Sequence, residues 1–175
     1  EKPTKTPVIN ALNTIQWSLY YPGLFHLRDL DLSPDDQTLL QESLNAYQRG
    51  NLTRALELLP EDAAFTSPDG TLYAAVAELS AGHIDTAQSL LGNNNQNDLL
   101  AAIRIFLAAV QNEIPKDSIA PPMSATHWLA HSYLNQAQHD LSAAKRAIGK
   151  SLELAPDFGF AWVRLAELEF GEGRT

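Results

Sequence analysis

The sequence predicts an all-α fold, an irregular α-solenoid of repeated helix–turn–helix units. Trp128 and Trp162 lie 34 residues apart, and a small residue, Ser132 or Ala166, follows each of them four positions later. Sequence repeats with periods of 20–50 residues are typical of solenoids, in which each repeat is one pair of packed helices.

A fainter copy of the same pattern runs through the earlier part of the chain. Three times a small residue is followed twelve positions later by an alanine, in the pairs Ser43/Ala55, Ala75/Ala87 and Ser132/Ala144. Seven positions after the first small residue stand Gly50, Gly82 and His139. Small side chains let antiparallel helices approach closely, and glycine ends a helix in the left-handed conformation. The pattern therefore predicts three helix hairpins that turn at these positions.

The helix boundaries follow from caps and prolines. Ser33-Pro34-Asp35-Asp36 starts a helix, because it combines a serine cap, a proline in the first turn and carboxylates near the positive helix end. The run Ile114–Met123 contains three prolines and excludes a helix. Helices are expected over residues 34–49, 52–59, 70–81, 84–91, 97–112, 124–137, 140–154 and 158–171.

This reading divides the chain into four parts. An N-terminal linker with an aromatic segment is expected over 1–32 and a degenerate helical lobe over 33–113. A proline-rich loop over 114–123 separates that lobe from a second one over 124–175. Within the first part, residues 12–21 alternate as a strand would and also carry a helical apolar stripe, so both alternatives stay open. The single methionine, Met123, and the end of the chain at a predicted turn suggest a fragment of a longer protein.

Composition excludes several classes of function. A net charge of −9 and a pI near 4.9 disfavour nucleic acid as a partner, because its phosphates would be repelled. The chain has no cysteine, and hence no disulfide or thiolate metal site. No apolar run reaches the length of a membrane span, and no phosphate-binding glycine loop or serine elbow occurs. We therefore expect no cofactor and no catalytic residue.

The repeats resemble the tetratricopeptide family. Signature positions of the third repeat are matched by Trp128, Ser132, Ala144, Ile148, Ser151 and Pro156. Those of the fourth are matched by Trp162, Leu165, Ala166 and Gly173. The chain departs from the family pattern at His131, Asn135 and His139, where the family has a large apolar residue, a tyrosine and a glycine.

A second resemblance concerns bacterial proteins that join a FecR-type domain to tetratricopeptide repeats. It rests on Gln16-Trp17-Ser18-Leu19-Tyr20-Tyr21-Pro22, on Ala109-Val110-Gln111-Asn112 and on the stretch from Phe158 to Leu168. It implies an exported protein in the periplasm, the outer envelope or the medium, with the cytoplasm as the alternative.

The tetratricopeptide resemblance also implies a binding groove, because the first helix of each repeat lines the concave side in that family. The groove positions would be Thr126, Leu129, Tyr133, Gln136, Phe160, Val163, Glu167 and Phe170. Such a surface suits an apolar or amphipathic protein segment. Two alternatives are self-association through the C-terminal repeat and packing of these side chains against further helices downstream or against the N-terminal segment.

Two histidine features have structural interpretations that we prefer. His127 and His131 have a spacing that can chelate zinc, but Trp128 stands where a metalloprotease needs its glutamate, so we expect packing and no metal. Asp140, next to His139, is placed to cap a helix. The sequence thus predicts a non-catalytic protein–protein interaction scaffold. The alternative is a structural or regulatory arm of a multidomain enzyme or sensor.

Overall fold

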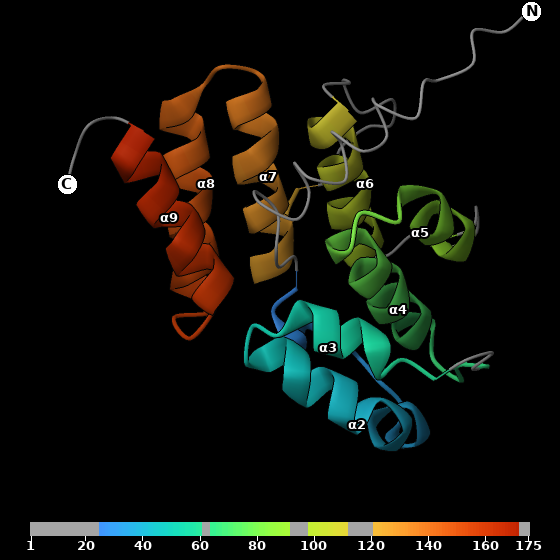
Figure 1. Cartoon of the computed structure of the whole chain (residues 1–175). Helices are drawn as coiled ribbons and strands as arrows, with labels where there is room; N and C mark the ends of the chain where they lie inside the picture. The colour runs from blue at the N-terminus through green and yellow to red at the C-terminus, as the bar shows by residue number, and fades with distance from the viewer. Residues whose placement is uncertain (1–24, 61–63, 92–97, 112–120, 172–175) are drawn as a thin grey trace, which may run out of the picture. The chain divides into compact units, whose positions relative to one another are not determined.

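A computed structural model describes residues 25–60, 64–91, 98–111 and 121–171, and these residues are helical without any strand (Figure 1). The elements are η1 (Leu27–Asp29), α2 (Pro34–Gln48), α3 (Leu52–Glu57), α4 (Pro68–Ser80), α5 (Ile84–Leu91), α6 (Asp98–Gln111), α7 (Ala125–Ala137), α8 (Leu141–Leu154) and α9 (Gly159–Gly171). The all-α prediction is confirmed. None of these helices is both long and apolar enough to cross a bilayer. The open question of strand or helix at 12–21 lies outside the described residues.

One helix begins earlier than expected. Ser67 caps α4 by accepting a hydrogen bond from the amide of Gly70, and Pro68 occupies the first turn. The same arrangement of serine and proline starts α2, where the Ser33 hydroxyl accepts from the amide of Asp36. The second Ser-Pro-Asp run was thus a start signal of the same kind as the first.

Three helix hairpins share one turn geometry. Gly50, Gly82 and His139 have positive φ angles of 75°, 81° and 63°, as the predicted turns require. The amide that follows each of them donates to the carbonyl five residues earlier, in the pairs Asn51–Ala46, His83–Glu78 and Asp140–Asn135, at 2.9–3.0 Å. Because the left-handed residue turns the chain there, the helices of α2/α3, α4/α5 and α7/α8 can pair.

The small residues lie where these paired helices meet. All six members of the three pairs predicted from the sequence are buried, with at most 1 % of their surface exposed. In the first hairpin the Ser43 hydroxyl of α2 donates to the carbonyl of Ala55 in α3 at 2.6 Å, so a hydrogen bond joins the two helices at this point. The predicted helix-crossing position is therefore confirmed for the first hairpin, and the burial of both small residues agrees with it in the other two.

The chain forms two compact units, but the division differs from the expected one. Of the described residues, the first unit comprises 31–60 and 64–91, and the second comprises 25–30, 98–111 and 121–171. Helix α6 was expected in the N-terminal lobe, yet it belongs to the second unit, because it packs along α7 with Phe106 5.0 Å from Tyr133 between ring centroids. The expected boundary at 114–123 falls mostly outside the described residues.

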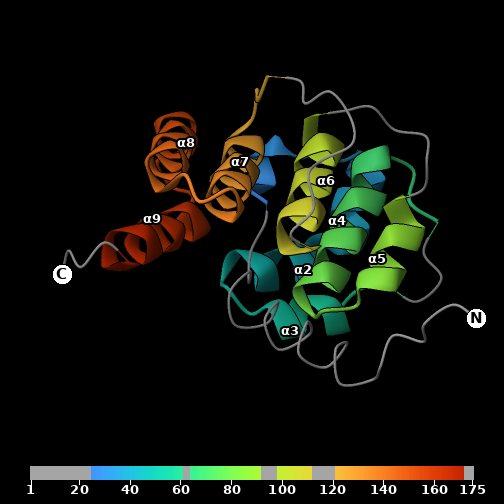
Figure 2. The same ribbon diagram turned by 90° about the horizontal axis from the view of Figure 1, so that it is seen from above.

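The second unit is layered around α7. In both views α7 lies between α6 and α8, and α9 packs against α8 (Figures 1 and 2). Its core contains Ile103, Phe106, Leu129, Ala130 and Ile148, all fully buried. Helix α7 is thus covered on two sides, and this decides which of its residues can meet a partner.

Candidate functional site

The expected groove is closed at three of its four positions on α7, whereas Gln136 is exposed. Thr126 and Leu129 have no exposed surface, and Tyr133 has 7 %. The hydroxyl and the amide of Thr126 donate to the carboxylate of Asp29 at 2.7 and 2.9 Å. The Thr126 hydroxyl also accepts from the amide of His26 at 2.9 Å. The prediction that these three residues line an open groove is wrong, because the segment around η1 and helix α6 cover this face.

Tyr133 and Gln136 are bound by a residue that sequence reasoning missed. Arg164, on α9, is only 3 % exposed, and its guanidinium lies 3.9 Å from the centre of the Tyr133 ring. It donates to the Ser132 hydroxyl at 3.1 Å and to the side-chain oxygen of Gln136. Arg164 therefore anchors α9 on α7, although an arginine on a surface-like helix carries no sequence signal for burial.

Two of the four groove positions on α9 are also engaged within the chain. Phe160 is half-buried beside Phe158, with their rings edge to face at 6.4 Å. Glu167 accepts a hydrogen bond from Arg164 at 3.2 Å. Val163 and Phe170 remain, and they are 51 % and 73 % exposed.

Helix α9 presents an apolar stripe to solvent. We define the α9 stripe as Trp162, Val163, Ala166 and Phe170, which are all exposed. They recur at helical spacing on one face, whereas Ala161, Arg164 and Leu168 on the opposite face are buried. The indole N–H of Trp162 already donates to the carbonyl of Pro156 at 2.9 Å, so the stripe presents no unsatisfied side-chain donor.

The repeat pattern identifies the row of α7 that corresponds to the α9 stripe. Shifted back by one 34-residue period, the α9 stripe falls on Trp128, Leu129, Ser132 and Gln136 of α7. Leu129 and Ser132 are fully buried. The carbonyl of Ala125, one turn before this row, accepts from the Ser151 hydroxyl of α8 at 2.7 Å. Within that row Ser132 and Gln136 accept hydrogen bonds from Arg164, so the α9 stripe corresponds to a row of α7 that lies beside α8 and is bound by α9.

The buried histidines form a separate cluster. The Nδ1 atom of His127 lies 2.5 Å from an oxygen of Asp98, whose other oxygen accepts from the amide and hydroxyl of Ser124. Burial alone would raise the pKa of Asp98, but the hydrogen bonds from Ser124 and His127 outweigh it and lower that pKa. Burial, reinforced by the nearby charge of His127, lowers the pKa of His131 from 6.5 to about 4.

The hydrogen bonds of this cluster join Asp98, the first residue of α6, to Ser124, the cap of α7. The hydroxyl of Ser124 is donated to Asp98 and not to an imidazole, which is not the geometry of an activated serine nucleophile. Within the described part of the chain, no three acidic or histidine side chains gather as they would to hold a metal ion. The Nε2 atoms of His127 and His131 are buried without a hydrogen-bond partner, which is a cost to folding.

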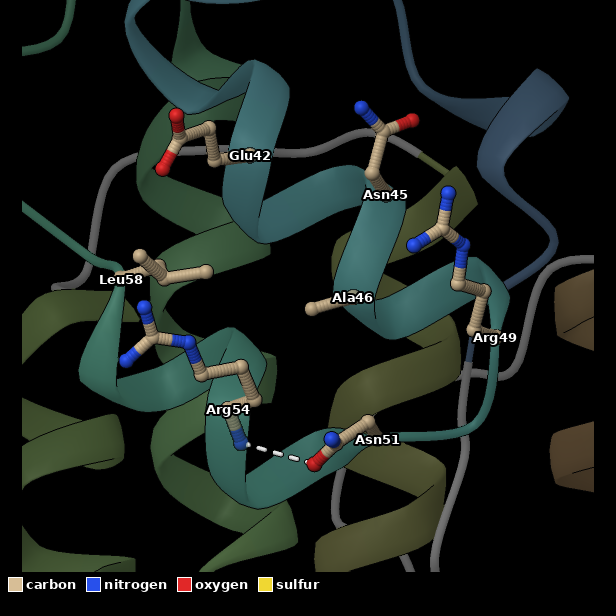
Figure 3. A pocket seen from close by; sticks show the side chains of 7 residues that line it. All are labelled: Glu42, Asn45, Ala46, Arg49, Asn51, Arg54 and Leu58. Carbon is tan, nitrogen blue, oxygen red and sulfur yellow. Dashed lines mark hydrogen bonds between the residues drawn. The ribbon is translucent and has the colours of Figure 1, made fainter.

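A hollow in the first unit has mixed polar lining. Its walls come from α2 and α3 and consist of Glu42, Asn45, Ala46, Arg49, Asn51, Arg54 and Leu58 (Figure 3). The two guanidinium groups lie on opposite sides of the hollow in Figure 3, and Arg54 is paired with Glu57 at 3.0 Å. The side chain of Asn51 caps α3. These groups do not converge on one point, so the hollow does not concentrate positive charge.

Comparison of the chain with family models, with curated proteins and with solved structures finds no match. The function therefore has to be argued from the surfaces described above.

Proposed function

We propose that this protein is a non-catalytic protein–protein interaction scaffold and that the α9 stripe is its contact surface. The observation that carries the proposal is the exposure of Trp162, Val163 and Phe170 in one row on α9. Large apolar side chains gathered on one face mark interaction sites more often than scattered ones do. The partner that fits such a row is the apolar face of an amphipathic helix.

The repeat architecture supports this proposal. Three hairpins have the same left-handed turn and buried small residues at the same positions, and we propose that they are units of a tetratricopeptide-like α-solenoid. Solenoids of this kind use stacked helices as rigid walls for binding other proteins. We further propose an envelope or secreted location, which rests on the resemblance to FecR-type proteins alone.

A helix taken from the chain itself provides the probe. A synthetic peptide with the sequence of residues 140–156 contains α8, which packs along α7, the helix that lies one repeat before α9. We expect this peptide, titrated into the isotope-labelled chain, to shift the amide resonances of α9. Phe170→Glu should weaken the effect, because it places a charge in the apolar row.

The control adds the same charge elsewhere in the second unit. Ser142 is exposed on α8, so Ser142→Glu should bind the peptide as the unchanged chain does. If the peptide shifts no α9 resonance at millimolar concentration, or if both variants bind equally, the α9 stripe is not a contact surface for helices and the proposed function fails.

A further inference from the structure

We propose that His127 and His131 of α7 form an acid-sensitive contact, which opens the packing of α6 on α7 when the pH falls. We call these two side chains the imidazole pair. Their ring centroids lie 5.2 Å apart on successive turns of α7, and the carboxylate of Asp98, at the start of α6, lies 2.5 Å from His127. The inference concerns the inside of the second unit and is independent of the α9 stripe.

The first member of the pair, His127, is already matched to Asp98. Because hydrogen bonds lower the pKa of Asp98, its carboxylate is ionised at neutral pH and can only accept. The Nδ1 atom of His127 therefore donates to it, and Nε2 remains as an acceptor. His127 has no exposed surface, and its Nε2 atom has no hydrogen-bond partner among the described residues. A second proton on this ring would occupy a buried N–H without an acceptor, which is costly.

The second member, His131, has no carboxylate of its own. Its Nε2 atom is likewise buried without a hydrogen-bond partner in the described part of the chain. Burial, reinforced by the charge of His127, lowers the pKa of His131 to about 4, although the charge of Asp98 acts in the opposite direction. One carboxylate thus serves two imidazoles, so only one of two positive charges could be balanced inside the contact.

Other charged groups on the elements around α7 do not supply a second carboxylate to the pair. Arg104 of α6 and Arg146 of α8 are exposed. The charged side chains of η1, α8 and α9 engage one another or the turn before α9, in the contacts Asp29–Thr126, His26–Asp157, Arg28–Asp157, Lys145–Glu169, Lys150–Glu153 and Arg164–Glu167. A second positive charge on the pair therefore gains more from hydration in an open form than from any group in the closed one.

Opening of this contact would uncover part of the expected groove. The carboxylate of Asp98 also accepts from the amides of Met123 and Ser124 at 3.2 and 3.1 Å, so it ties the start of α6 to the start of α7. Further along the same two helices, Phe106 lies 5.0 Å from Tyr133 between ring centroids. When α6 separates from α7, the ring of Tyr133 loses this cover. Acid thus controls access to a face that is closed at neutral pH.

Hydrogen exchange of the full 175-residue chain, followed by mass spectrometry, tests the inference. Protection factors are compared at pH 7 and pH 5 after correction for the intrinsic exchange rate, because they report the population of locally open forms. The lowered pKa of His131 alone gives about a twentyfold rise of that population, and its partial exposure reduces the effect, so we expect about tenfold. The loss of protection should fall on the amides of α6 and α7, while those of α2 in the first unit keep theirs.

Two histidine variants separate the imidazole pair from acid effects elsewhere. His131→Leu removes the group that cannot be matched, so the protection of α6 and α7 should change little between pH 7 and pH 5. His139→Asn is the control, because His139 is exposed at the turn and asparagine tolerates its positive φ. This variant should lose protection at pH 5 as the unchanged chain does.

Nuclear magnetic resonance of the imidazole side chains gives a measurement that needs no variant. We expect the signals of His131 to shift only below pH 5, since its pKa is lowered from 6.5 to about 4. A His131 ring that takes up its proton near pH 6.5 overturns the inference. So does an α6–α7 contact that stays equally protected at both pH values, or a His131→Leu variant that responds as the unchanged chain does. An equal loss of protection in α2 would mean general acid unfolding, which also contradicts a local opening.

Discussion

Asp36 joins the starts of two helices, and its replacement by asparagine should be costly. Its side chain is 1 % exposed. One carboxylate oxygen accepts from the amide of Thr66 at 3.0 Å, and the other accepts from the amide and hydroxyl of Ser67 at 2.7 and 2.5 Å. Ser67 is in turn the cap of α4, so the carboxylate of α2 holds the first turn of α4 in place.

The loss of stability expected for Asp36→Asn follows from the three hydrogen bonds that its carboxylate accepts. Asparagine has nearly the same shape as aspartate but only one acceptor oxygen, so at least one of the three donors would face an NH₂ group. Hydrogen bonds to a charged group contribute about 1.5–3 kcal/mol each, and an unsatisfied buried donor costs about 1–3 kcal/mol. We expect Asp36→Asn to lower the free energy of unfolding by about 2–4 kcal/mol at pH 7.

Asp35 is a matched control. It occupies the same first turn of α2 but is exposed, so Asp35→Asn removes little beyond its favourable interaction with the helix dipole, about 0.3–1 kcal/mol. Urea denaturation of both variants, followed by far-UV circular dichroism, gives the comparison. Equal losses in the two variants would refute the argument that the hydrogen bonds to Asp36 stabilise the fold.

The pH dependence provides a second check. Burial by itself raises the pKa of Asp36, but the hydrogen bonds from Ser67 and from the backbone of Thr66 outweigh it and lower the pKa from 3.8 to about 2. A lowered pKa means that the charge stabilises the fold above pH 3.8 and ceases to do so as the pH falls through about 2. The difference between the unchanged chain and Asp36→Asn should therefore narrow across this window, and a constant difference would contradict the assignment.

Three further predictions concern stability and can be measured by thermal or urea unfolding. The pKa of His131 is lowered to about 4, so the native state loses stability as the pH falls below 6.5. His131→Leu removes this loss and should therefore stabilise the protein more at pH 5 than at pH 8. An equal gain at both pH values would contradict this. His139 and Gly50 both have positive φ, which glycine adopts more easily than other residues. His139→Gly should therefore raise the free energy of unfolding by about 1 kcal/mol, and Gly50→Ala should lower it by a similar amount. Changes of the opposite sign would show that the turns are not strained. Ala144→Leu should cost about 1–3 kcal/mol by overpacking a fully buried crossing, whereas Ser142→Leu on the exposed face of the same helix should cost little.

Local signals predicted the helices and turns correctly because they act within a few residues. The Ser33-Pro34 start, the left-handed residues at the turns and the small residues seven positions before them are all short-range features. His139 adopts the glycine conformation at φ 63°, since the repeat pattern around it specifies the same turn. The sequence comparison of the repeats was therefore enough to place the hairpins.

The partners of Asp36 and Asp98 could not be predicted from the same signals. Both carboxylates bind the backbone at the start of another helix, 25–31 residues further along the chain. In the sequence each reads only as an acidic residue near a helix start, which ordinarily interacts with its own helix. Only the packing of helices brings these caps within hydrogen-bonding distance.

The expected groove shows most clearly that burial by distant segments could not be predicted from the sequence. The sequence determined the helical register, and with it the face of α7 and α9 on which each residue lies. Only the tertiary structure decided that His26 and Asp29, about one hundred residues away, bury Thr126. It likewise decided that Leu129 is fully buried while the equivalent residue of α9, Val163, is 51 % exposed. The reason is physical: the period of a helix fixes which side chains share a face, but the burial of that face depends on which distant segment packs against it.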